Sequence, residues 1–214
     1  MILIELKSKN CKNLPFHGLQ SFIHSGNLIK YVKFRRCVPI ILQYTTNIMD
    51  KITQQRIDKL HPSVRDEVKQ IIKECDEALT GRAKVRITQG LRSFEEQEKL
   101  YAIGRITSGK KVTNAKAGQS IHNYGLAVDI CLMIDGKTAS WDTAKDWDND
   151  QVADWYECVK IFARHGWDWG GNWKTFKDLP HFEKKNIRTK KGLIKTAWRT
   201  LSRMPRDKQN YILF

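Results

Sequence analysis

The feature that most constrains the fold of this chain is a helical spacing of apolar residues that is followed by strand patterns. Apolar residues recur at helical spacing through residues 60–79, on both sides of a helix boundary at Pro62. Residues 84–89 then alternate between apolar and polar side chains, and residues 126–134 form an apolar run of strand length. Helices followed by neighbouring strands predict an α+β domain, in which N-terminal helices pack on a small antiparallel sheet.

Capping and turn signals predict the limits of further elements. A capping box at Ser93 and Glu96 predicts a helix that ends near residue 103. The Asp-Gly pair at 135–136 predicts a hairpin turn, and a further helix is expected over 151–165. These elements all fall in the middle of the chain.

The formal net charge of +15 is concentrated at the two ends of the chain. Residues 1–48 carry about +6 and residues 184–214 about +9, whereas residues 49–183 hold 21 basic and 21 acidic side chains. A strongly basic protein normally suggests a polyanionic partner, but here the segment with regular patterning is neutral. We therefore expect a central domain over 49–183 with no specific nucleic-acid partner.

Both basic ends differ in pattern from this central domain. Residues 1–48 show no sustained period, and we interpret them as a disordered basic leader or as an extension upstream of a start at Met49. In 189–204, apolar residues fall on one face of an expected helix and basic residues recur every four positions on another. Such an amphipathic helix can lie on an anionic membrane or lipopolysaccharide surface, or it can dock on the domain. The sequence leaves both possibilities open.

Cysteine usage and hydropathy indicate the compartment in which the chain is made. The five cysteines are odd in number and form no CxxC pair, which argues against a disulfide framework and against a thiolate metal site. No apolar run approaches the roughly twenty residues that cross a bilayer, and no segment reads as a standard signal peptide. We expect a monomer that is made in the cytoplasm without a signal peptide.

Three polar residues stand in contexts that suit a catalytic metal ion. His122 lies just before the strand expected at 126–134, Asp129 lies on that strand, and His181 lies on a later one. Catalytic zinc typically has three N or O ligands and an open fourth position, whereas structural zinc is closed by four ligands. A turn at 123–125 would let His122 and Asp129 reach one ion. A His and an Asp seven residues apart are also a common accident, so the spacing by itself does not decide the matter.

A resemblance to a known family rests on three segments of the chain: 89–93 with Glu96-Gln97, 118–129 and 166–183. They resemble the zinc peptidases of the D-alanyl-D-alanine carboxypeptidase and Hedgehog-type fold, especially the L-alanyl-D-glutamate endopeptidases of phage endolysins. The resemblance covers roughly residues 50–183. Its specific element is a Ser-x-His-x6-Asp motif followed by Asp-x-x-His.

The resemblance implies a role for each matching residue. The implied zinc ligands are His122, Asp129 and His181. Asp178 would be the acid/base that acts on the zinc-bound water, although many members of the wider family carry Glu there. Arg92 would contact the region of the scissile carbonyl. The alternative is that Arg92 is an ordinary surface arginine. Ser120 would help to hold the substrate.

Two further features of this region each have two interpretations. The Trp-rich segment 167–173 is either buried core or the wall of a groove, in which case Trp169 would bind substrate. Glu183 either orients a ligand histidine or is a solvated acid at a strand end. An Asp178 that also acts as an acid needs a raised pKa, which apolar surroundings would supply.

The sequence therefore predicts a zinc-dependent peptidoglycan hydrolase that cleaves the L-Ala–D-Glu bond of the stem peptide. We expect an endolysin-like enzyme that acts on the cell wall after release. The alternative within the class is a D-alanyl-D-alanine carboxypeptidase or dipeptidase. The alternative outside it is a non-catalytic module that binds a cell surface or nucleic acid through its basic ends.

Overall fold

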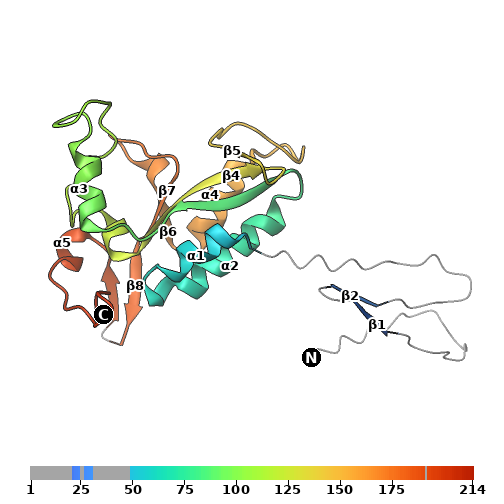
Figure 1. The fold of residues 1–214 in the computed structure, drawn as a ribbon, viewed down its shortest axis with the longest axis horizontal. Coiled ribbons are helices and arrows are strands. Elements are labelled where there is room, and N and C mark those ends of the chain that lie inside the picture. Colours follow the sequence, from blue (N-terminus) through green and yellow to red (C-terminus); the bar gives the residue numbers. More distant parts are fainter. Residues whose placement is uncertain (1–20, 25–26, 31–48, 191) are drawn as a thin grey trace, which may run out of the picture. The chain divides into compact units, whose positions relative to one another are not determined.

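The computed structural model describes residues 21–24, 27–30, 49–190 and 192–214 (Figure 1). The chain divides into two compact units, Met1–Thr46 and Asn47–Phe214. In the first unit, strands β1 (Ser21–His24) and β2 (Asn27–Lys30) pair as an antiparallel hairpin. The prediction of a leader over 1–48 otherwise falls outside the described residues.

The second unit combines helices with an antiparallel sheet. Its helices are α1 (Lys51–Asp58), α2 (Pro62–Ala78), α3 (Phe94–Ala102), α4 (Asp154–Arg164) and α5 (Trp198–Leu201), with 3-10 turns η1 (Ile121–Tyr124) and η2 (Gly170–Asn172). Its strands are β3 (Ala83–Gln89), β4 (Ala127–Ile134), β5 (Thr138–Ser140), β6 (Trp167–Trp169), β7 (His181–Lys184), β8 (Asn186–Thr189) and β9 (Gly192–Lys195). The main sheet has the order β3-β4-β7-β6, and β5 also pairs with β4. The predicted α+β class is confirmed.

The central strand β4 separates the core from the site. Side chains alternate between the two faces of a strand, and Val128, Ile130 and Leu132 of β4 are fully buried in the main apolar cluster. Helices α1, α2 and α4 contribute to the same cluster and lie against the sheet (Figure 1). Phe162 of α4 stacks on Phe182 of β7 with ring centroids 4.1 Å apart. The opposite face carries Asp129 of β4 and, on β7, His181 and Glu183, next to the buried apolar residues Cys131 and Met133 further along β4.

The predicted helix over 189–204 is wrong. Strands β8 and β9 pair as an antiparallel hairpin, and among the described residues of this segment only Trp198–Leu201 is helical. Gly192 lies at the turn with a φ of 115°, and a glycine within a helix costs about 1 kcal/mol relative to alanine. Leu193 and Ile194 of the apolar set therefore lie on β9, and Trp198 and Leu201 lie on the short helix α5.

The C-terminal residues pack into the core of the second unit, to which they belong. Leu201 and Ile212 are buried in its core, and His61 Nε2 donates to the Ile212 carbonyl at 2.8 Å. Docking on the domain, one of the two possibilities for this segment, is what the structure shows, although the segment is not the expected helix. Among the described residues, no helix is long and apolar enough to cross a membrane.

Candidate active site

The pairing of β4 with β7 places two of the predicted ligands side by side. Asp129 and His181 are direct partners across these antiparallel strands, so their side chains project from the same face of the sheet. Their neighbours Val128 and Phe182 are also partners and are fully buried in the core. Alternation along both strands thus turns Asp129 and His181 away from the core.

The third predicted ligand, His122, comes from η1 immediately before β4. The chain reverses after η1 at Gly125, which has a φ of 67°. A side chain there would be strained, because only glycine adopts this left-handed region at little cost, and its Cβ would lie 2.6 Å from the His61 nitrogen. The predicted turn between His122 and Asp129 is confirmed.

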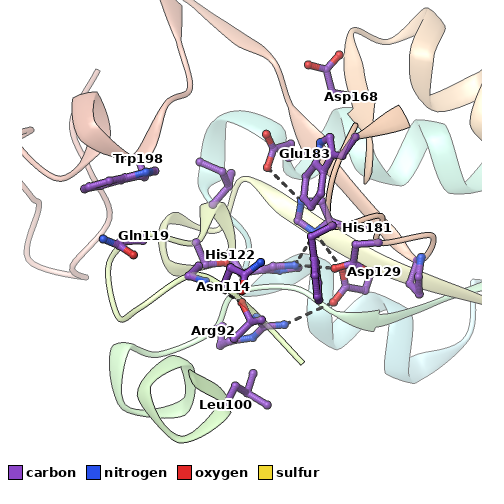
Figure 2. Close-up of a pocket in the computed structure, with 18 of the residues that line it drawn as sticks. Arg92, Leu100, Asn114, Gln119, His122, Asp129, Asp168, His181, Glu183 and Trp198 are labelled. Atoms are coloured by element: carbon purple, nitrogen blue, oxygen red, sulfur yellow. Dashed lines mark hydrogen bonds and ion pairs between the residues drawn. The ribbon is translucent and has the colours of Figure 1, made fainter. Parts of the chain in front are cut away.

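The three predicted ligands converge on one point (Figure 2). His122 Nε2, Asp129 Oδ1 and His181 Nδ1 lie 3.1 Å from one another. Two ligand atoms bound to one tetrahedral zinc ion are separated by about 3.3 Å, given the usual bond lengths. Two imidazole nitrogens and one carboxylate oxygen at this spacing suit a catalytic metal ion with an open position.

Each imidazole donates its other ring N–H to a fixed acceptor. His122 Nδ1 lies 2.8 Å from the Gly90 carbonyl, and His181 Nε2 lies 3.1 Å from Glu183 Oε2. Because a carbonyl and a carboxylate only accept, these contacts leave His122 Nε2 and His181 Nδ1 with lone pairs for a metal ion when the two rings are neutral. Both lone pairs face Asp129 Oδ1, an arrangement that a bound cation stabilises. Glu183 is therefore bonded to the predicted ligand His181, as the first of its two interpretations expects.

The charges at this site balance one another. Burial raises the pKa of Asp129, but His122 and His181 outweigh that effect and hold it well below its usual range. Burial lowers the pKa of His181, but hydrogen bonds to Asp129 and Glu183 outweigh burial and raise it to about 9. The carboxylates of Asp129 and Glu183 therefore make this position favourable for positive charge.

Arg92 borders the site and is held in place by side chains. Its Nη2 lies 3.5 Å from Asp129 Oδ2, its Nη1 donates to Gln97 Oε1 at 2.9 Å, and its side chain is only 13% exposed (Figure 2). Its backbone N–H donates to the His122 carbonyl at 3.1 Å. The alternative of an ordinary surface arginine is therefore excluded.

Asp178 lies in a tight turn just before the ligand His181. Its backbone N–H donates to the Gly170 carbonyl, and its own carbonyl accepts from His181 N–H, both at 3.2 Å. A Cβ at Gly170 would collide with the Asp178 carbonyl, so this turn requires glycine. Burial raises the pKa of the Asp178 carboxyl, and the negative charge of Asp129 raises it further. The expected direction of the shift is confirmed.

These residues open into one cavity of about 730 Å³. The predicted site residues that line it are Arg92, Ser120, His122, Asp129, Asp178 and His181. Trp169 is not among the lining residues. It is 9% exposed, and its Nε1 donates to the Leu179 carbonyl at 2.7 Å. Trp169 therefore belongs to the core, because as part of β6 it projects to the same side as its partner Phe182.

Other aromatic residues line the cavity in place of Trp169. Trp173 packs against the His181 ring with centroids 5.0 Å apart, and Trp198 lies across the cavity from His181 (Figure 2). The structure also brings in the Gly90 carbonyl, which sequence reasoning missed. No sequence signal identifies a carbonyl acceptor or the docked Trp198, because both depend on how distant segments pack.

Comparison with known proteins agrees with this site. A family model described as D-alanyl-D-alanine carboxypeptidase matches residues 113–184. The peptidoglycan L-alanyl-D-glutamate endopeptidase CwlK of Bacillus subtilis (strain 168) is 42% identical over 125 residues, which cover 56% of this chain and 75% of CwlK.

Two solved structures are also similar. The L-Ala D-Glu endopeptidase ChiX of Serratia marcescens has 22% identity and a TM-score of 0.44, covering 64% of this chain and 88% of ChiX. The LD-carboxypeptidase LdcB has 19% identity and a TM-score of 0.41, covering 77% of this chain and 83% of LdcB.

The antiparallel sheet with its His-Asp-His metal position and adjacent acid defines a metallopeptidase. The similarity to CwlK and the match to the family model identify the family of this metallopeptidase. The chain belongs to the M15 peptidase family, the family of D-alanyl-D-alanine carboxypeptidases.

Proposed function

We propose that this metallopeptidase is a zinc-dependent endopeptidase that cleaves the L-Ala–D-Glu bond of the peptidoglycan stem peptide. The observation that carries the choice of bond is the 42% identity to CwlK, whose name specifies that cleavage. The donor set of two histidines and one aspartate supports zinc as the metal.

The mechanism follows from the residues around the metal position. Zinc held by the three ligands would polarise the scissile carbonyl and lower the pKa of the attacking water. Asp178 borders the same cavity, and its raised pKa suits a group that takes a proton from water and returns it to the leaving amine. Arg92 presents its guanidinium to the cavity, where it can stabilise the negative charge that develops on the carbonyl oxygen.

The rest of the cavity suits an acidic peptide. Its volume of about 730 Å³ is within the usual range for ligand sites. Trp173 and Trp198 supply apolar walls, and Lys195 supplies positive charge, whereas Lys185 is paired with Asp168, which also lines the cavity. A D-glutamyl residue beside the scissile bond carries negative charge that Lys195 can attract.

The metal is tested by zinc analysis of the purified protein. We expect one zinc ion per chain in the wild-type protein and a loss of zinc in His122→Ala. His165→Ala is a matched control, because His165 is also part-buried and bonded to a carboxylate, Glu74, but lies outside the site. Wild-type protein without zinc, and with activity that a chelator leaves unchanged, would overturn the metal assignment.

The bond is tested by mass spectrometry of digested peptidoglycan. New D-Glu amino termini are the expected products. Release of D-Ala alone would identify a carboxypeptidase instead, and intact peptidoglycan with tight binding would identify a non-catalytic module.

An endolysin role extends this proposal, with synthesis in the cytoplasm and action on the wall after release. Expression inside cells should then cause lysis only when the membrane is permeabilised by another agent. Lysis at the same rate without that agent would contradict the need for separate release.

A further inference from the structure

A cluster of five carboxylates spans the end of the connection between β5 and α4 and the first turn of α4, outside the active site. These acids form two overlapping groups of three. Within each group, one ligand atom from every residue lies within 4.8 Å of the other two. The first group is Asp146, Asp148 and Asp154, and the second is Asp148, Asp150 and Glu157. Neither group borders the active-site cavity.

The spacing of these acids matches a known calcium-binding loop. The twelve-residue EF-hand loop takes side-chain ligands from positions 1, 3, 5, 9 and 12, and a backbone carbonyl from position 7. With Asp146 as position 1, the five side-chain positions are Asp146, Asp148, Asp150, Asp154 and Glu157. Position 7 is Val152, where any residue type supplies a carbonyl.

The backbone of the loop also follows this pattern. Position 6 is normally glycine, which makes a sharp turn, and Gln151 occupies it here with a φ of 75°. The Asp146 carboxylate accepts from the backbone N–H groups of Asn149 at 2.6 Å and Gln151 at 2.9 Å. Asp146 is thereby held facing the centre of the loop.

Three buried carboxylate oxygens in the cluster have no hydrogen-bond partner: Asp148 Oδ1, Asp154 Oδ2 and Glu157 Oε2. Asp154 is 0% exposed, and its other oxygen accepts from Trp147 N–H at 2.8 Å. A buried carboxylate oxygen without a partner is strongly unfavourable, and a cation bound among these oxygens would relieve that cost. Burial and the neighbouring acids Asp150, Asp148 and Asp154 also raise the pKa of Glu157 to about 7.

We propose that residues 146–157 bind one calcium ion. Calcium takes six to eight oxygen ligands in flexible geometry, which five carboxylates and one carbonyl can supply. The cluster contains no histidine or cysteine, the ligands that favour zinc. Magnesium requires near-ideal octahedral geometry and retains its waters, so it suits this loop less well.

The ion would stabilise the second unit at a defined place. Asp148 Oδ2 accepts from the backbone N–H and the hydroxyl of Thr80, at 3.0 and 2.9 Å. Thr80 lies between α2 and β3, and Asp154 begins α4. Calcium bound between Asp148 and Asp154 therefore links three parts of the fold, and it should raise the melting temperature.

The experiment is calcium titration of the full-length protein by isothermal titration calorimetry. We expect one calcium ion per chain, and affinity at least tenfold lower in Glu157→Gln. Asp142→Asn is the matched control, because Asp142 precedes the cluster in the same connection and belongs to neither group. It should bind calcium like the wild type.

Two further measurements keep the test independent of folding and of the proposed zinc chemistry. Calcium should raise the melting temperature of the wild-type protein more than equal magnesium does, and His122→Ala should still bind calcium. No binding at millimolar calcium, equal affinity in Glu157→Gln, or no thermal shift would each overturn the proposal. Failure of the zinc assignment leaves these outcomes unchanged, since the two sites share no residue.

Discussion

Removal of the Glu183 carboxylate tests how the site holds its metal. Glu183 Oε2 lies 3.1 Å from His181 Nε2 and fixes the ring so that Nδ1 faces the metal position. Loss of such a partner typically weakens metal binding by about 10–100-fold, which corresponds to about 1.4–2.7 kcal/mol. Its side chain is 26% exposed, so solvent partly screens its charge.

Two substitutions of Glu183 should lower the zinc affinity by different amounts within that range. Glu183→Gln keeps an oxygen that can accept the His181 N–H and loses only the charge, so we expect zinc affinity to fall about tenfold. Glu183→Ala leaves a buried N–H without an acceptor, and we expect a loss near 100-fold.

The assay is competition for zinc with a chromophoric chelator. Glu67→Gln is the control, since Glu67 is 28% exposed and also ion-paired, to Lys184, away from the metal position. Wild-type zinc affinity in Glu183→Ala would refute the inference that this hydrogen bond orients the ligand.

Three further predictions concern catalysis and stability. Asp178→Asn should retain zinc but lower kcat about 10²–10⁴-fold, and full turnover on stem peptide would assign the base elsewhere. Gly170→Ala should reduce activity at least tenfold, because the new Cβ collides with the Asp178 carbonyl; wild-type kinetics would contradict the tight turn. Leu201→Ala should lower the free energy of unfolding by about 2–5 kcal/mol, because Leu201 is fully buried, whereas Leu193→Ala, at a side chain 63% exposed, should change it little. Equal denaturation midpoints for these two variants would show that the C-terminal segment is not docked.

Local signals predicted much of the fold correctly. The capping box of Ser93 and Glu96 is present in both directions, with Ser93 N–H donating to the Glu96 side chain at 2.7 Å and Glu96 N–H donating to Ser93 Oγ at 3.0 Å. The apolar period of residues 60–79 predicted the buried face of α2. Such patterns are readable because each depends on residues within a few positions of one another.

The same local reasoning failed where distant contacts compete with it. The apolar spacing of 189–204 indicated a helix, but its members separate into a hairpin and a short helix, with Leu201 buried in the core. Trp169 looked like a groove wall, yet its pairing with Phe182 turns it into the core. In both cases the partner lies outside the window that the pattern covers.

The sequence by itself predicted, through the family resemblance of its motifs, which residues would hold the metal, because their order along the chain and the acid three residues before His181 are local facts. Only the tertiary structure decided that Asp129 and His181 are direct partners across two strands, and that Gly90 and Glu183 orient the ligand rings. It also decided that the acids of 146–157 converge with three oxygens unpaired. Strand register and burial depend on contacts between distant segments, which local periodicity does not specify.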